Sequence, residues 1–399
     1  MSLKSEASKG VLWVLLEKLG HQIIQLVIFI VLARLLTPED FGLVAMIVIF
    51  FAISQTFIDS GFGQALIRKK EISQEDRSTV FWFNLALSVC FYALIFFSAP
   101  AIASFYEREE LVLLARIMGL AVVFFGIAIV QRSEMTHSLE FKKQAYAQIP
   151  AVLIAGIVSI ILAYNSFGVW ALAIQYLLIS LLSSIMLWIL YPIKINAKWS
   201  KESFFELFSF AYKLLISGLI GTLFQHIYKL IIGKFFAAST LGLYTPAKKM
   251  QRISTESLVA IIQKITYPLL AKVGEDLGRL KRGYKQVIQT SSFIIFPCVL
   301  CLIVFSESIL HYVLGEIWIP ASPFLRIICI SGMIYHLHSI NLNVLKVLGR
   351  SDLFLKLEVI KKVNISIAIV IGLQYGVYGL LVGQVVSSYI ANETRLTAN

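Results

Sequence analysis

The chain has 399 residues, of which 58% are hydrophobic and only 15% are charged. Soluble domains are typically about 45–50% apolar and about 25% charged, so this composition excludes a water-soluble globular protein. The apolar residues are spread over the whole chain, which also excludes a soluble domain held by one anchor. The net charge of +12 is first interpreted as a signal for helix orientation in a membrane, and no nucleic-acid partner is expected.

Apolar segments long enough to cross a bilayer recur along the whole sequence, and each such helix needs about 20 residues. Twelve candidates run over approximately 11–34, 41–66, 79–103, 111–131, 145–164, 168–190, 204–233, 238–271, 287–314, 321–345, 354–373 and 376–391. The first carries Glu17 and Lys18 and lacks a small-residue cleavage site, so we expect a retained helix. The sequence predicts an all-α polytopic membrane protein with about 12 transmembrane helices.

The distribution of lysine and arginine over the loops predicts how these helices are oriented. With the N-terminus inside, the inner loops hold most of the 35 basic residues, whereas the outer loops hold only Arg34, Arg108 and Lys234. Cytoplasmic loops carry an excess of Lys and Arg, so both termini are predicted to be cytoplasmic. The other basic residues, which fall within predicted spans, are Lys18, Arg116, Lys213, Lys229, Lys248, Lys249, Arg252, Lys264 and Arg326.

The loops and cysteines give no indication of catalysis or metal binding. No predicted loop is long enough to be a catalytic domain. All four cysteines lie in apolar segments, and Cys298-x-x-Cys301 has no second pair and no nearby histidine, which favours a structural role over a metal or redox site. We therefore expect no enzyme activity, no catalytic residues, no metal and no cofactor.

An internal repeat relates two halves of the chain at an offset of about 200 residues. Three matches carry it, namely 34–43 over 234–243, 167–172 over 375–380, and Arg116 over Arg326. Each half holds six predicted spans, an even number, so the halves form a parallel repeat. We expect an N-terminal six-helix bundle over 1–200 and a C-terminal one over 201–399, with a shared central cavity as in alternating-access transporters. The alternative is two bundles without a pathway.

Several stretches resemble a known family of membrane transporters. LARLLTPEDFGLVAM (32–46), DSGFGQALIRKKEISQEDRSTVFWFNL (59–85), FGVWALA (167–173) and GLYTPAKKMQ (242–251) are similar to bacterial O-antigen and exopolysaccharide flippases. These belong to the multidrug/oligosaccharidyl-lipid/polysaccharide exporter superfamily, and the nearest branch resembles the colanic acid and teichuronic acid exporters. The resemblance runs from near residue 1 to about 390.

The resemblance implies a fold like that of the multidrug exporters of the superfamily, in the bacterial cytoplasmic (inner) membrane. It implies transport of an undecaprenyl-pyrophosphate-linked oligosaccharide from the inner to the outer leaflet, with membrane lipids and polysaccharide polymerase or export machinery as partners. Family members often have fourteen helices. Here the twelfth is short and ends in the polar ANETRLTAN, which resembles a truncation.

Cations within the predicted spans are the first candidates for substrate binding. Lys213, Lys248, Lys249 and Arg252 are predicted to receive the pyrophosphate or an acidic sugar, because Lys and Arg give charge-assisted hydrogen bonds to such oxygens. The equivalent positions of the first half are apolar. The alternative for each cation is an internal ion pair, for example Arg252 with Glu256. Pro246 leaves open where this helix starts, and hence how deep the cations lie.

Acidic residues and a histidine within the spans are candidates for ion coupling. Glu17 and His21 lie four residues apart on one helix face, and histidine titrates near neutral pH. Asp59 and Glu256 are the other two candidates. The alternatives are an intrahelical salt bridge for the first pair and a helix cap for Asp59.

Arg116, Arg326 and Lys229 are weaker candidates for substrate binding. Both arginines are predicted to lie near the outer surface, where snorkelling to the lipid headgroups explains them. Their match across the repeat is the observation that favours a functional role.

Two other functions compete with flipping a lipid-linked glycan. A cation-coupled multidrug exporter should present acidic residues to cationic drugs, but the charges within these spans are mostly basic. A membrane glycosyltransferase or ligase should have a sizeable outer loop with carboxylates. The only acidic outer cluster is Glu107, Glu109 and Glu110, in a short loop. The absence of a phosphate-binding loop predicts that an ion gradient supplies the energy.

Overall fold

The computed structural model describes residues 20–196, 199–260, 262–263, 266, 270 and 276–396. All regular elements within these residues are helical, which confirms the predicted all-α class. Eight described helices are long and apolar enough to cross a membrane. The four other predicted spans also overlap helices, over Gly20–Leu35, Ala238–Arg252, Ser351–Leu373 and Gly376–Leu396. The chain is a polytopic membrane protein.

Contacts within the chain divide it between Ser239 and Thr240 into two compact units. The first holds the helix Gly20–Leu35, then α2 (Pro38–Ile58), the π-turn η1 (Asp59–Gly63), α3 (Gln64–Arg68), α4 (Gln74–Tyr106), α5 (Glu110–Ile127), α6 (Ile129–His137), α7 (Phe141–Tyr164), α8 (Val169–Leu190) and α9 (Lys201–Phe235). Helix α9 packs on α2, η1 and α4, so by contact it belongs to this unit. The halves 1–200 and 201–399 remain a prediction from the sequence repeat.

The second unit is formed by the helices that follow. They are α10 (Ala238–Arg252), the π-turn η2 (Ile253–Ser257), α12 (Leu277–Val304), α13 (Ser306–Ile309), η3 (Leu310–Leu314), η4 (Glu316–Ala321), α14 (Ser322–Met333), α15 (Tyr335–Val347), α16 (Ser351–Leu373) and α17 (Gly376–Leu396). Pro246 lies inside α10 and does not delay the helix, which begins at Ala238. The last helix extends to Leu396, beyond the predicted end near 391. Its last residues are polar, and hydropathy does not count polar residues as part of a span.

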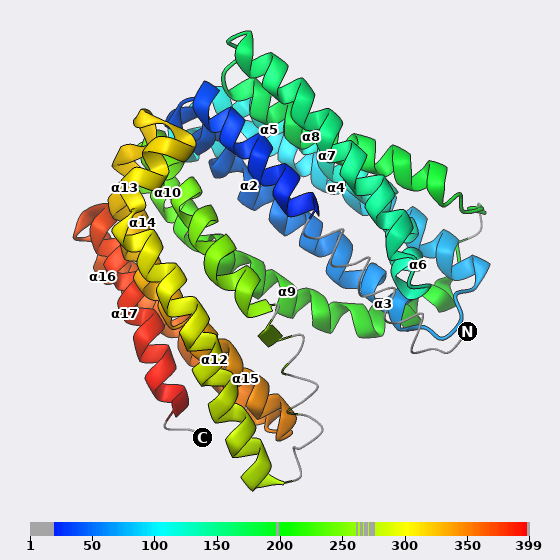
Figure 1. Cartoon of the computed structure of the whole chain (residues 1–399). Helices are drawn as coiled ribbons and strands as arrows, with labels where there is room; N and C mark the ends of the chain where they lie inside the picture. The colour runs from blue at the N-terminus through cyan, green and yellow to red at the C-terminus, as the bar shows by residue number, and fades with distance from the viewer. Residues whose placement is uncertain are drawn as a thin grey trace. The chain divides into compact units, whose positions relative to one another are not determined.

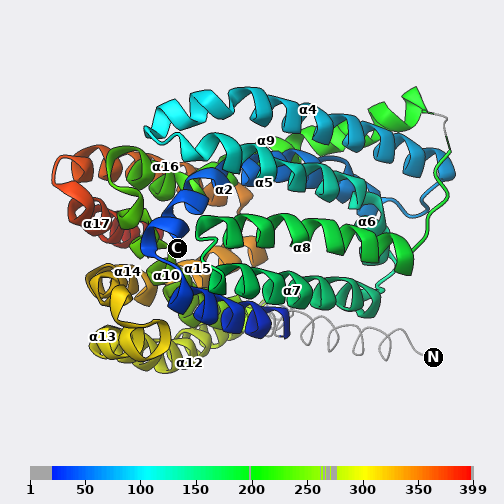
Figure 2. The same cartoon turned by 90° about the horizontal axis from the view of Figure 1, so that it is seen from above.

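The same order of packing recurs in both units. In the first, α4 contacts α5, α5 contacts α8, and α8 contacts α7 (Figure 2). In the second, α12 contacts α14, α14 contacts α17, and α17 contacts α16 (Figure 1). At the offset of the predicted repeat, α4 matches α12, α5 matches α14, α8 matches α17 and α7 matches α16.

Local geometry repeats as well. A helix is interrupted in each unit, at Ala128 between α5 and α6, with φ −100° and ψ 6°, and at Ile334 between α14 and α15, with φ −93° and ψ −4°. Gly168 and Gly376 both have positive φ values, 54° and 75°, at the turns that precede α8 and α17. Only glycine adopts such values without strain, so the matched glycines close equivalent hairpins.

The matched arginines have matched contacts. Arg116 Nε donates to the carbonyl oxygen of Phe96 at 3.3 Å, and its guanidinium lies 4.4 Å from the centre of that ring. Arg326 Nε donates to Ser306 Oγ at 2.7 Å, and Arg326 also pairs with Glu307 at 3.1 Å. In both units the arginine contacts a residue twenty positions earlier, Phe96 within α4 and Ser306 at the start of α13.

Capping explains where two helices of the first unit begin. Thr37 Oγ1 accepts from the amide of Asp40 at 3.3 Å, and the Asp40 carboxylate accepts from the amide of Thr37 at 2.9 Å. Ser73 and Asp76 form the same reciprocal pair at the start of α4. Each pair satisfies two amides that the helix leaves without partners.

Candidate functional site

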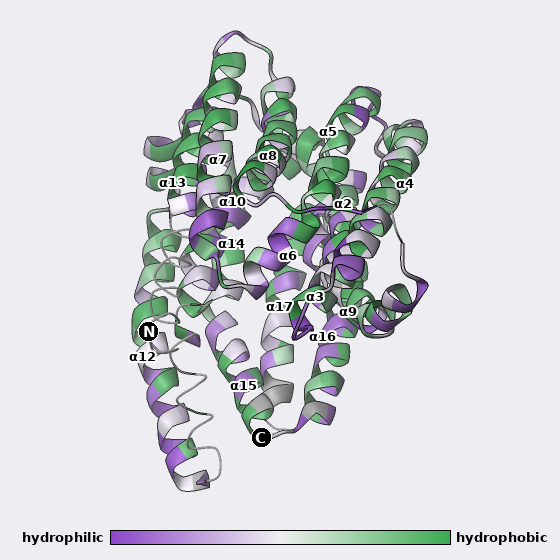
Figure 3. Ribbon diagram, turned by 90° about the vertical axis from the view of Figure 1, so that its right-hand side faces the viewer, coloured by the Kyte–Doolittle hydropathy of each residue, from purple (hydrophilic) through white to green (hydrophobic). Residues whose placement is uncertain are grey.

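An interrupted helix carries a cluster of polar side chains in each unit. The apolar α5 is followed, after Ala128, by the far more polar α6, and α14 is followed, after Ile334, by α15, which carries two histidines and two asparagines. Figure 3 shows the contrast between hydrophobic α5 and hydrophilic α6. A π-turn packs against each polar helix, η1 on α6 and η2 on α15. Because π-turns inside helices frequently mark functional sites, these two clusters are the candidate sites.

In the first unit, Asp59 opens the π-turn η1 and faces a cation on α6. Asp59 and Arg132 attract each other electrostatically. The Arg132 guanidinium lies 4.5 Å from the centre of the Phe125 ring. A Cβ on Gly63 would lie 3.0 Å from Ser133 Oγ, so η1 touches α6 closely. Asp59 is also the C-cap residue of α2, its amide donating to the carbonyl oxygens of Gln55 and Thr56, and the helical segment continues through η1.

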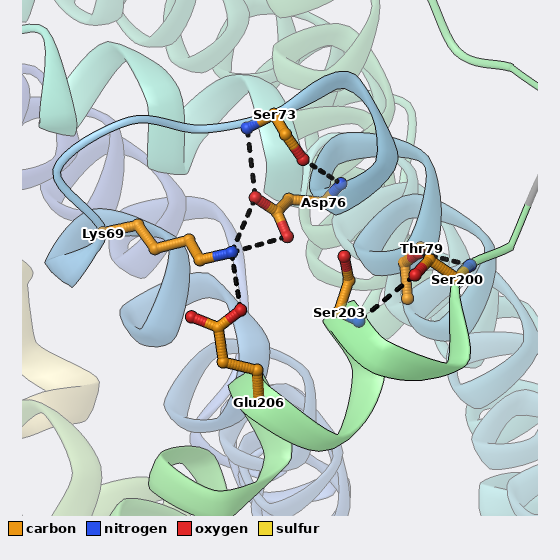
Figure 4. A network of polar contacts seen from close by, with 7 residues as sticks. All are labelled: Lys69, Ser73, Asp76, Thr79, Ser200, Ser203 and Glu206. Carbon is orange, nitrogen blue, oxygen red and sulfur yellow. Dashed lines mark hydrogen bonds and ion pairs between the residues drawn. The ribbon is translucent and has the colours of Figure 1, made fainter.

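A second polar group lies beside this cluster and joins α3, α4 and α9 (Figure 4). Lys69 Nζ contacts both carboxylate oxygens of Asp76 and one of Glu206, each at 2.9 Å. The Asp76 side chain is fully buried. Burial lowers the pKa of the Lys69 amine, but hydrogen bonds to Glu206 and Asp76 outweigh that effect and raise the pKa above its usual 10.5. The three charges hold the start of α9 on the bundle.

Hydroxyl groups complete this attachment. Thr79 Oγ1 accepts from the amide of Ser200, and Ser200 Oγ accepts from the amide of Ser203 (Figure 4). The imidazole of His137 on α6 contacts the carbonyl oxygen of Lys69 at 2.8 Å. Glu134, also on α6, pairs with Arg77. The first unit thus compensates its buried charges with charges of opposite sign.

In the second unit, Glu256 lies in the π-turn η2. It pairs with Arg252, one turn earlier on the same helix, at 3.7 Å, and the Arg252 side chain is 61% exposed. Tyr335 on α15 interacts electrostatically with both charged groups. The alternative expected for Arg252, an ion pair with Glu256, is therefore present as a long and exposed contact.

Lys248 points in a different direction from Arg252. Its amine donates to Gln251 Oε1 at 2.8 Å, and the buried Gln251 amide donates to Thr255 Oγ1 at 2.5 Å. A Cβ on Gly332 would lie 2.8 Å from Gln251 Nε2. This chain of contacts therefore faces α14, whereas Arg252 faces away from the packed interior. Lys249 is half-buried on the same helix.

Polar side chains from neighbouring helices converge on α15. Ser292 on α12 hydrogen-bonds His336 Nε2 at 2.9 Å, and Tyr284 donates to the Asn341 carbonyl oxygen. Lys361 Nζ on α16 lies 3.0 Å from His338 Nε2. His336 and Asn341 are fully buried, and each bond satisfies one of the two polar atoms of their side chains.

The other predicted site residues that the structure describes lie on α9 and on the helix Gly20–Leu35. Lys213 is exposed on α9, with Nζ 5.8 Å from the centre of the Tyr212 ring. Lys229 is half-buried on α9. His21 Nε2 lies 3.5 Å from the amide nitrogen of Gln25. Glu17 and Lys264 lie outside the described residues.

Sequence reasoning did not find Arg132, Asp76, His338 or Lys361. Arg132 and Lys361 were counted with the inner loops, whereas the structure places them on α6 and α16. Two sequence signals could have found these clusters. Span 111–131 runs into QRSEMTH, and span 321–345 contains YHLHSINLN, which holds an unusual number of polar residues for a membrane helix.

Comparison with known proteins shows the family. Residues 31–323 match the family described as "Polysaccharide biosynthesis protein". The chain belongs to this family. It is 28% identical over 358 residues to the teichuronic acid biosynthesis protein TuaB of Bacillus subtilis, covering 88% of this chain and 73% of TuaB. It is 26% identical over 390 residues to the lipopolysaccharide biosynthesis protein WzxC of Escherichia coli, covering 96% of this chain and 78% of WzxC.

Solved structures show the same fold at lower sequence identity. The lipid II flippase MurJ, in an inward closed conformation, matches with a TM-score of 0.81 and 15% identity, covering 97% of this chain and 87% of MurJ. An inward-facing multidrug resistance transporter of the MATE family and MOP superfamily matches with a TM-score of 0.74 and 15% identity, covering 95% of each chain. These likenesses show that the chain shares its fold with MurJ and with this transporter, as predicted.

Proposed function

We propose that this protein flips a lipid-linked oligosaccharide, an intermediate of cell-surface polysaccharide, across the bacterial inner membrane with both termini cytoplasmic. The match of residues 31–323 to the polysaccharide biosynthesis family carries the proposal. The names of the relatives support it, because TuaB and WzxC are named for teichuronic acid and lipopolysaccharide biosynthesis and the structural relative MurJ is a lipid II flippase.

The finer part of the proposal concerns the carrier lipid. An undecaprenyl pyrophosphate presents several negative oxygens, and the cations of α10 are its proposed partners. Arg252 is 61% exposed, and its contact with Glu256 is long, at 3.7 Å. Exposed pairs of this kind contribute about 0–1 kcal/mol. A pyrophosphate can therefore replace Glu256 at little cost, and the guanidinium fork suits two phosphate oxygens.

Lys248 and Lys249 add charge to the same helix, and Lys213 adds charge on α9. The Lys248 amine is held by Gln251, so its position is fixed by the packing of α10 on α14. Alternating access driven by an ion gradient is the proposed mechanism. Asp59 and Glu256 are the proposed coupling groups, because each lies in a π-turn beside a cationic partner.

Reconstituted full-length protein tests the proposal. Vesicles would carry a polyprenyl-pyrophosphate oligosaccharide on one leaflet, and a membrane-impermeant lectin would detect the fraction that reaches the other. Wild type should translocate the glycan. The triple variant Lys248→Gln/Lys249→Gln/Arg252→Gln should lose at least about tenfold in rate, corresponding to about 1.4 kcal/mol.

The matched control removes three other cations, with Arg279→Gln/Lys281→Gln/Lys285→Gln on the exposed first turns of α12. This variant should keep the wild-type rate. A protein that exports cationic drugs but never moves the polyprenyl glycan would overturn the proposed function. Full translocation by the α10 triple variant would overturn only the assignment of the pyrophosphate site.

A further inference from the structure

A small polar cavity lies within the second unit, among α14, α15, α16 and α17. Its volume is about 70 Å³, which is room for a few water molecules, since one needs roughly 10–15 Å³ on this measure. The polar side chains that line it are Ser331, Tyr335, His338, Lys361, Ser387 and Ser388. All of them carry hydrogen-bonding groups, so the cavity is suited to hold water next to the side-chain nitrogens of His338 and Lys361.

The central contact of this cavity joins His338 and Lys361. Their side-chain nitrogens lie 3.0 Å apart, and His338 is only 8% exposed. A hydrogen bond between two nitrogens requires a donor and an acceptor, so one partner must be neutral. An ammonium can donate to a neutral imidazole, or an imidazolium to a neutral amine. The bonded pair therefore carries at most one positive charge, and protonation of both groups would place two cations at this distance.

The elements packed against α15, and α15 itself, carry other titratable groups. They are Tyr335 and His336 on α15 itself, Glu256 on η2, Tyr284 on α12, and Glu358 and Lys362 on α16. The side chains that α14 and α17 contribute to the cavity are serines and apolar residues. Tyr335 connects the cavity to the π-turn, because it lines the cavity and interacts electrostatically with Glu256 and Arg252.

We propose that His338 and Lys361 form a proton-exchange site that separates α15 from α16 when it takes up a second proton. When the N–H···N bond opens, water in the cavity delivers the proton to the electron pair of the nitrogen that had accepted the bond. Like charges then replace the hydrogen bond, and the contact between the two helices is lost. Release of the proton to the same water restores it. No other reactant is needed, and the number of protons balances.

The link to transport rests on the proposed function. Tyr335 lies between this pair and the Arg252–Glu256 pair, so a shift of α15 would change the surroundings of the proposed pyrophosphate partner. Protonation and substrate binding would then bias the same helix, which is what coupling between two sites requires.

Nuclear magnetic resonance of the full chain in nanodiscs tests the site without any transport assay. The chain has only six histidines, so side-chain ¹⁵N labelling gives few signals, and His338→Gln identifies the one in question. Groups that interact strongly titrate together. Lys361→Met should therefore move the titration midpoint of His338 by about one pH unit or more. Lys362→Met, the adjacent charge removal, should leave it in place.

A His338 titration that is unchanged in Lys361→Met, or that moves equally in Lys362→Met, would overturn the proton site. The translocation assay then tests the coupling. Wild-type rate should depend on pH between about 5 and 8, the range in which histidine changes charge, and His338→Gln should abolish that dependence. A pH-dependent rate in His338→Gln equal to wild type would overturn the coupling. Failure of wild type to translocate at any pH would overturn the proposed function and leave the titration result standing.

Discussion

The two polar clusters occupy equivalent places in the repeat but are built from different chemistry. Around α6, opposite charges meet: Arg77 with Glu134, and Arg132 with Asp59. Around α15, histidines meet a hydroxyl group and an ammonium, in His336 with Ser292 and His338 with Lys361. The same interrupted helix thus supports a compensated charge cluster in one unit and a histidine cluster in the other.

This difference suggests a division of roles between the units. Buried opposite charges are costly to separate because each partner alone would be a desolvated charge, so the α6 cluster favours one fixed arrangement. Histidine gains or loses a proton near neutral pH, so the contacts of the α15 cluster can change with pH and favour two arrangements. The comparison predicts that substitutions near α6 change mainly stability, and that those near α15 also change pH response.

The largest effect is expected from Asp76→Ala. Asp76 is fully buried against Lys69, and removing one partner of a buried pair typically costs about 3–5 kcal/mol. Thermal unfolding in detergent, followed by intrinsic fluorescence, should show a clearly lower midpoint. Asp352→Ala is the control, because its partner Arg350 is 56% exposed and such pairs contribute about 0–1 kcal/mol. Equal melting of the two variants would contradict a stabilising role for the cluster.

The next largest effect is the loss, at alkaline pH, of the stability that Lys69 contributes. The pKa of Lys69 is raised above 10.5, so its contribution is fully present below 10.5 and declines as pH rises through the higher folded-state value. The difference in melting midpoint between wild type and Lys69→Met should be constant from about pH 6 to 9 and shrink above 10.5. A difference that already shrinks near neutral pH would show that Lys69 is not the group responsible.

A smaller effect is expected in the second unit from Ser292→Ala. This change removes the hydroxyl partner of a fully buried histidine, His336. An unsatisfied buried polar group costs about 1–3 kcal/mol, which is less than the loss of a charge partner. Ser366→Ala is the control, since its hydroxyl bonds only a backbone carbonyl at an exposed position, and the midpoint should change little. A drop in melting midpoint as large as that of Asp76→Ala would show that the α15 cluster contributes as much to stability as the α6 cluster.

The sequence was sufficient to predict the helices but insufficient to predict the clusters. Hydropathy finds a span because burial in lipid depends on each residue separately, and the repeat follows from matched residues such as Arg116 and Arg326. Hydropathy does not predict the helix interruptions at Ala128 and Ile334, which depend on backbone angles.

The contacts that build the clusters join residues far apart in the chain, and spacing along one helix does not reveal them. Lys69 and Glu206 are an example, because their contact depends on how α9 packs on the start of the bundle. The contacts around the π-turns are equally hard to predict from spacing along one helix. Spacing by four residues places Lys248, Arg252 and Glu256 on one face, but the Lys248 amine is drawn towards Gln251 and α14.

The smallest effect on stability is expected from Arg252→Gln, and it separates function from folding. Asp59 in η1 has its cationic partner on another helix, whereas Glu256 in η2 has Arg252 on its own helix, exposed and at 3.7 Å. Losing such a contact should cost no more than about 0.5 kcal/mol, so the melting midpoint should stay near that of wild type. Translocation of the polyprenyl glycan should nevertheless fall, because the guanidinium is a proposed pyrophosphate ligand. Unchanged translocation with unchanged stability would leave Arg252 with no role. A large loss of stability would instead mean that the α15 side of the repeat, like the α6 side, depends on its charge pair to fold.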